Sequence, residues 1–167
     1  MTKERARDRI LEWEGAVRRC EQWRREGLRI VFANGVFDLL HVGHVRYLTA
    51  ARELGDRLVV GINGDRSTAA HKGAGRPVVG AEDRAAVVAA LRGVDAVVIF
   101  DQSTVAVLLE ALRPDVHAKG TDYQVETVPE RDTMVRLGGV TAIAGDAKQH
   151  ATRDLVERIR DRAGEPT

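Results

Sequence analysis

From Leu28 onward, short runs of apolar residues alternate with stretches whose apolar residues recur at helical spacing. This alternation predicts repeated strand–helix units arranged around a parallel sheet. The apolar runs contain mostly Val, Ile and Ala, which is typical of strands covered by helices on both faces. The predicted strands are 28–34, 57–63, 96–100, 116–119 and 140–144, and the predicted helices are 45–54, 81–91, 104–112, 129–137 and 152–162.

The segment before the first strand has a different pattern. Residues 3–25 place Ile10, Trp13, Val17 and Cys20 on one stripe among charged residues, which predicts an amphipathic helix that ends at Gly27. Its apolar stripe covers either the sheet or a second subunit. We expect this helix in residues 1–26, one α/β domain in 27–162 and a tail in 163–167.

Five such strands predict a doubly wound, Rossmann-like parallel sheet. In sheets of this kind, ligands bind beyond the carboxyl ends of the strands, near the point where the strand order reverses. Polar residues follow three of the predicted strands: residues 34–44 after the first, 63–65 after the second and 119–123 after the fourth. We therefore expect these segments to form one site.

Residues 34–44, with the sequence NGVFDLLHVGH, lie between the first strand and the first helix of the sheet. Free N–H groups and the positive dipole end at the start of a helix attract phosphate. His41 and His44 fit phosphate donors better than metal ligands, since a zinc site needs at least a third protein ligand. A second alternative is that the two histidines only cap the helix and bind no ligand. Gly43 between them lets a phosphate approach the backbone closely. The segment lacks both the G-x-G-x-x-G and the G-x-x-x-x-G-K-[ST] phosphate motifs.

Two later segments carry cations. Residues 71–77 form a basic, glycine-containing loop, which is either an ordinary solvated loop or a lid whose Lys72 and Arg76 neutralise a triphosphate. Lys119 ends the fourth strand, where it either reaches solvent along the sheet edge or contacts a triphosphate. In the second case Asp122 and Tyr123 would contact hydroxyl groups of an acceptor.

Composition narrows the class of protein. A chain of 167 residues with 44% hydrophobic residues is sufficient for one core, and a net charge of +1 argues against a non-specific nucleic-acid binder. Cys20 is the only cysteine, which excludes an intrachain disulfide and indicates a reducing cytoplasm. We find no signal peptide and no apolar run of roughly 20 residues, so we expect a cytoplasmic protein that does not enter the membrane.

Residues 35–44 resemble the H-x-G-H signature of the nucleotidyltransferase superfamily, which includes cytidylyltransferases and adenylyltransferases. Residues 34–48, 61–65, 72–77, 82–84 and 113–123 together resemble the D-glycero-β-D-manno-heptose 1-phosphate adenylyltransferases. In many bacteria that activity forms the C-terminal half of a bifunctional protein with a sugar kinase, and this chain resembles the stand-alone form. The resemblance implies AMP transfer from ATP to a sugar 1-phosphate in ADP-heptose biosynthesis, with Mg²⁺, in a protein expected to be a homodimer.

The resemblance also implies roles for individual residues. His41, His44, Lys72 and Lys119 would be catalytic, and no residue is expected to bind a metal directly. Asp38, Asp65, Arg76, Asp122 and Tyr123 would bind substrate. The nucleotide would be bound by residues at the first turn, after the fourth strand and at the start of the last helix: Asn34, Gly35, Val36, Phe37, Gly43, Gly120 and Thr152.

Two alternatives stay open at this stage. One is another transferase of the superfamily, such as a glycerol-3-phosphate cytidylyltransferase, although the chain lacks the Arg-Thr-Glu-Gly-Ile-Ser-Thr signature typical of that group. The other is a regulator that binds nucleotide without turnover. Such a regulator would be expected to have lost a key histidine or lysine, and the four catalytic candidates are all present.

Overall fold

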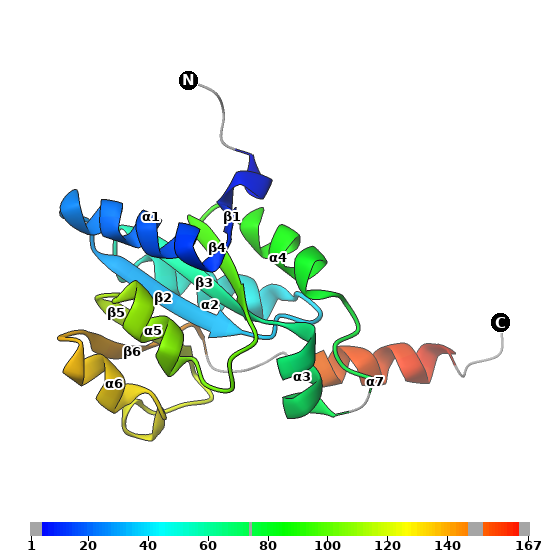
Figure 1. Ribbon diagram of the computed structural model, residues 1–167. Coiled ribbons are helices and arrows are strands. Elements are labelled where there is room, and N and C mark those ends of the chain that lie inside the picture. The colour runs from blue at the N-terminus through cyan, green and yellow to red at the C-terminus, as the bar shows by residue number, and fades with distance from the viewer. Residues whose placement is uncertain (1–4, 74, 147–151, 164–167) are drawn as a thin grey trace.

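The computed structural model describes residues 5–73, 75–146 and 152–163, with the backbone alone at 152–155 and 163. Its centre is a parallel sheet in the order β1-β4-β3-β2-β5-β6, with helices on both faces (Figure 1). The strands are β1 (Ile10–Leu11), β2 (Ile30–Gly35), β3 (Arg57–Asn63), β4 (Ala96–Phe100), β5 (Val116–Gly120) and β6 (Val140–Ala144). The helices are η1 (Ala6–Arg9), α1 (Trp13–Arg25), α2 (Val42–Arg52), α3 (Asp65–Lys72), α4 (Ala81–Ala89), α5 (Ala106–Leu112), η2 (Val125–Thr127), α6 (Arg131–Arg136) and α7 (Thr152–Ala163).

The predicted doubly wound, Rossmann-like fold is confirmed. All five predicted strands are present, and β3, β4 and β6 have the predicted bounds. The sixth strand, β1, is a two-residue addition at the edge, where Ile10 pairs with Val97 and Leu11 with Val98.

The N-terminal helix is shorter than predicted, because α1 begins only at Trp13. Ile10 lies in β1 and packs on one face of the sheet, whereas Leu11 packs on the other. Alternating sides are the normal geometry of a strand, so the two residues can pair with the open edge of β4 while their half-buried side chains pack on opposite faces of the sheet. The predicted end of the helix is correct, since Gly27 follows it at φ 74°.

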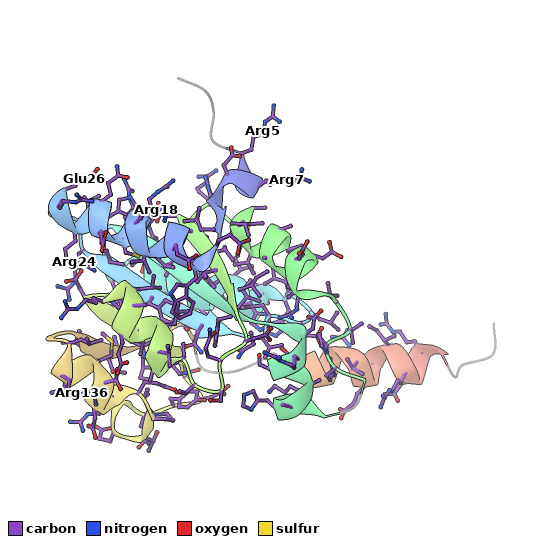
Figure 2. All side chains as sticks on the ribbon, in the orientation of Figure 1. Arg5, Arg7, Arg18, Arg24, Glu26 and Arg136 are labelled. Carbon is purple, nitrogen blue, oxygen red and sulfur yellow. The ribbon has the colours of Figure 1, made fainter. Side chains whose placement is uncertain are left out.

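The apolar stripe of α1 covers the sheet. Ala16, Cys20 and Trp23 are buried in a core layer with α5 and α6, while α2 and α4 cover the opposite face. Figure 2 shows Arg24 near the end of α1, from which it donates hydrogen bonds to the carbonyls of Leu112 and Arg113 at 2.7 and 3.1 Å. These bonds fasten α1 to the end of α5.

The strand order reverses between β2 and β5, because β2 is followed by β3 and β4 on one side whereas β5 and β6 lie on the other. Helix α3 was not predicted. Its buried residues are the small polar Ser67 and Thr68, which leave no apolar periodicity to detect. Helix α7 projects away from the sheet (Figure 1), and among the described helices none is both long and apolar enough to cross a bilayer.

Candidate active site

A cleft of about 1150 Å³ lies at the carboxyl ends of the central strands, where the strand order reverses. Its walls come from the turn after β2, the end of α3, the loop after β4 and the segments after β5 and β6. A ligand of nucleotide size fits a cleft of this volume. The walls include Asn34, Gly35, Val36, Phe37, Asp38, His41, Gly43, His44, Lys72, Arg76, Lys119, Gly120, Asp122 and Tyr123.

The two histidines of the cleft cap helix α2. The His41 Nδ1 atom accepts a hydrogen bond from the Gly43 N–H at 3.1 Å, and the His44 Nδ1 atom accepts one from the His41 N–H at 3.3 Å. A ring nitrogen that accepts a hydrogen bond carries no proton, so each neutral ring carries its proton on Nε2. The two rings stack with their centroids 3.8 Å apart.

Phe37 packs against His44. Its ring meets the His44 ring edge-on with centroids 5.2 Å apart, and its backbone has a φ of 50°, in the left-handed region that non-glycine residues rarely adopt. Strain of this kind is found mainly where the surrounding structure holds a functional site in place.

Lys119 lies near the end of β5, across the point of strand-order reversal from the histidines that follow β2. It is 8% exposed, its Nζ atom lies 4.6 Å from the centre of the Tyr123 ring, and it is 3.5 Å from Asn34 Oδ1. Burial lowers the pKa of Lys119, and the negative charge of Glu130 partly offsets this effect. The cleft therefore holds a partly desolvated cation close to the end of β2.

Asp38 and Arg76, both predicted to bind substrate, line the cleft but bind each other. The Asp38 carboxylate accepts hydrogen bonds from Arg76 Nη1 at 2.6 Å and from the N–H groups of Val78 and Val79 at 2.7 and 3.0 Å. Burial alone raises the pKa of Asp38, but these bonds together outweigh it and hold the pKa below the usual 3.8. Their arrangement ties the segment after α3 to the turn that carries the histidines.

Asp65 is not among the residues that line the cleft. Its Oδ1 atom accepts a hydrogen bond from Arg84 Nη2 at 2.7 Å, and Arg84 is only 2% exposed. The same guanidinium donates to the carbonyls of Val36 and Val79. Asp65 therefore pairs with a buried arginine that is also hydrogen-bonded to Val36, one of the residues that line the cleft.

Two predicted site residues remain, Lys72 and Thr152. Lys72 lies exposed at the end of α3, facing the cleft as one of its lining residues. Thr152 begins α7, but its side chain is outside the described residues, as are the neighbouring residues 147–151.

Glu130 and His117 are two of the polar residues at or beside the cleft that the sequence analysis missed. Glu130 lines the cleft, and its Oε2 atom is buried without a hydrogen-bond partner among the described residues. His117 is fully buried in β5 and contacts Asn34. The sequence does not predict a role for His117, because the apolar pattern of a strand does not show which residue of another strand a histidine will contact.

The fold and the cleft define a Rossmann-like protein with an anion-binding site at its switch point. Helix-start N–H groups, two imidazole donors and two lysines all border that site. Comparison with known proteins identifies the family. Residues 32–157 match the cytidylyltransferase-like family, and the chain belongs to that family.

Similar proteins are known as sequences and as structures. The chain is 46% identical over 152 residues to the bifunctional protein HldE of Methylobacillus flagellatus, a match that covers 91% of this chain and 31% of that protein. It is 50% identical over 137 residues to the protein of the same name from Koribacter versatilis, covering 82% and 28%. The chain thus spans about a third of the length of these relatives.

A solved structure has the same fold. The lipopolysaccharide core biosynthesis protein from Thermoplasma volcanium superposes with a TM-score of 0.62 and 30% sequence identity. That match covers 74% of this chain and all of the other chain.

Proposed function

We propose that this chain transfers the AMP group of ATP to a sugar 1-phosphate, D-glycero-β-D-manno-heptose 1-phosphate, giving ADP-heptose and pyrophosphate. The observation that carries the proposal is the stacked pair His41 and His44 at the start of α2, which borders the same cleft as Lys72 and Lys119. The similarity to the HldE proteins over most of the chain supports the choice of substrate.

The chemistry requires little proton transfer by the protein. An oxygen of the sugar 1-phosphate, already an anion at neutral pH, attacks the α-phosphorus of ATP, while the bond from that phosphorus to the bridging oxygen breaks and pyrophosphate leaves. Positioning and neutralisation of negative charge then supply the rate. The Nε2–H groups of His41 and His44 donate to phosphate oxygens, and Lys72 and Lys119 balance the charge of the triphosphate.

Mg²⁺ suits this site as a partner of the nucleotide. Among the described residues, no group of three or more His, Cys, Asp or Glu side chains could hold a metal by itself. Mg²⁺ commonly binds through substrate phosphates and one or two carboxylates, and Asp146 presents a carboxylate on the cleft wall. Bound there, it would neutralise charge on the leaving pyrophosphate.

Glu130 favours a ligand rich in hydroxyl groups. A buried acceptor without a partner costs roughly 1–3 kcal/mol, a cost that a ligand hydroxyl can remove by donating to it. Phosphate oxygens cannot do so, because they carry no donor and repel a carboxylate. We therefore assign the region near Glu130 to the sugar of a substrate, with Asp122 and Tyr123 as further contacts.

The test is release of pyrophosphate in the presence of Mg²⁺. The protein is offered ATP or CTP together with the heptose 1-phosphate, other sugar 1-phosphates or glycerol 3-phosphate. We expect release with ATP and the heptose 1-phosphate. Release only with CTP and glycerol 3-phosphate would replace the proposal with a cytidylyltransferase, and nucleotide binding without any release would replace it with a regulator.

We further propose a homodimer that works in the cytoplasm, where ATP is available. Helix α7 projects from the body and is strongly amphipathic, and its Ile159 is 62% exposed, which suits a contact with a second copy. Light scattering after size exclusion tests this assignment. We expect a dimer for the unchanged protein and a monomer for Ile159→Glu, and a monomer in both would contradict it.

A further inference from the structure

His117 is a buried polar residue to which neither the motifs nor the proposed chemistry assigns a role. It is 0% exposed in the middle of β5, with the Phe32 ring 5.7 Å away. Its Nε2 atom lies 3.0 Å from Asn34 Oδ1, on the neighbouring strand β2. This contact crosses the point at which the strand order reverses.

Lys119 fixes the direction of that hydrogen bond. Its Nζ atom lies 3.5 Å from the same Asn34 oxygen, and an ammonium group can only donate. A flipped Asn34 would turn its NH2 group toward this cation, so Oδ1 must be the atom that faces both partners. His117 therefore donates from Nε2.

The ring of His117 is neutral. Burial, helped by the positive charge of Lys119, lowers the pKa of His117 to about 3. With the proton on Nε2, the Nδ1 atom is a buried acceptor, and it has no hydrogen-bond partner among the described residues. A buried acceptor without a partner makes the folded protein less stable than an apolar side chain would. We therefore expect His117 to have a role that compensates for this loss of stability.

The role follows from the geometry of a carboxamide. Because the Asn34 oxygen is held by two donors from β5, the NH2 group lies on the other side of the same planar side chain. Asn34 lines the cleft beside the turn that carries His41 and His44. An amino group fixed in this direction adds N–H donors to the cleft without adding charge.

We propose that His117 is a positioning residue: by donating to Asn34 Oδ1 it holds the carboxamide with its NH2 group toward the cleft, where that group donates to an anionic oxygen of the bound nucleotide. The inference rests on the proposed nucleotidyl transfer. Preorganised donors of this kind act most strongly where charge develops in the transition state.

A double-mutant cycle tests the proposal, using kcat for pyrophosphate release from ATP and heptose 1-phosphate. We expect His117→Leu and Asn34→Ala each to lower kcat roughly tenfold or more, with the KM for ATP changed much less. The double variant should be no slower than Asn34→Ala, because His117 acts only through Asn34. His117→Gln, which keeps an N–H donor, should recover most of the rate.

Val116→Ala is the matched control, since it removes buried methyl groups one residue away and has no hydrogen bond to Asn34. It should keep kcat while lowering stability. Effects of His117→Leu and Asn34→Ala that multiply, or a kcat for His117→Leu within about twofold of the unchanged protein, would overturn the proposal.

A second measurement needs neither turnover nor a variant. Nitrogen-15 NMR of the histidine rings in the unchanged protein reports which nitrogen of His117 carries the proton. We expect a proton on Nε2 that stays unchanged between about pH 5 and pH 9. A proton on Nδ1, or titration of the ring in this range, would refute the inference. Absence of pyrophosphate release by the unchanged protein would instead refute the proposed function.

Discussion

His41 caps helix α2 in the structure and is proposed to bind phosphate, and a single substitution can separate these two roles. Its Nδ1 atom accepts a hydrogen bond from the Gly43 N–H and so caps helix α2, while its Nε2–H is assigned to a phosphate oxygen. His41→Ala removes both. His41→Asn keeps the cap, because asparagine is among the best residues at this position, but it removes the donor on the far side of the ring.

The two losses are expected to differ in kind and in size. Removing the cap should cost about 0.5–2 kcal/mol of stability, and each kcal/mol lowers the melting temperature of a protein of this size by roughly 2–4 °C. Removing one preorganised transition-state donor should lower kcat by about 10²–10³, equivalent to about 2.7–4 kcal/mol. The stability effect is too small to unfold the protein at 25 °C, so the two effects can be measured separately.

Thermal unfolding and pyrophosphate release are measured on both variants. We expect His41→Asn to melt within a few degrees of the unchanged protein yet to lose as much kcat as His41→Ala. If His41→Asn kept turnover within about threefold while His41→Ala lost it, His41 would act as a cap rather than as a donor.

Three further predictions concern other parts of the molecule. The pKa of Asp38 is lowered in the folded state, so the stability that its bonds contribute is complete above the usual pKa of 3.8 and is lost as the pH falls through the lower folded value. Denaturation at a series of pH values should therefore show Asp38→Asn less stable than the unchanged protein at pH 7, with a difference in stability that narrows only as the pH falls below 3.8. A difference that stays constant at low pH would contradict the assignment. Gly61→Ala places a Cβ atom 2.7 Å from the Phe32 ring and should cost about 1–3 kcal/mol in chemical denaturation, part of which Phe32→Leu should restore; an unchanged midpoint would refute the clash. Glu130→Ala should raise the KM of the hydroxyl-bearing substrate about tenfold or more, and Glu130→Gln less so, whereas equal KM values in all three proteins would remove Glu130 from the binding site.

The sequence by itself determined the fold class and most of the predicted residues that line the cleft. Five strands could be predicted because each is a continuous apolar run, and the histidine turn could be predicted because its residues are adjacent in the chain. Among the predicted site residues whose side chains the structure describes, all except Asp65 line the cleft. The parallel-sheet rule succeeded because the carboxyl ends of parallel strands necessarily meet at one edge.

Only the tertiary structure decided which of these residues bind one another. Asp38 and Arg76, predicted as separate contacts for substrate, form an ion pair that ties the segment after α3 to the histidine turn. His117 and Lys119 gain their common partner, Asn34, only because β5 pairs with β2 across the reversal. Burial and hydrogen bonding depend on neighbours from distant parts of the chain, whereas periodicity is a property of a few consecutive residues. The sequence could therefore locate the site, but the contacts that orient its donors were decided by the packing of strands that are remote in the chain.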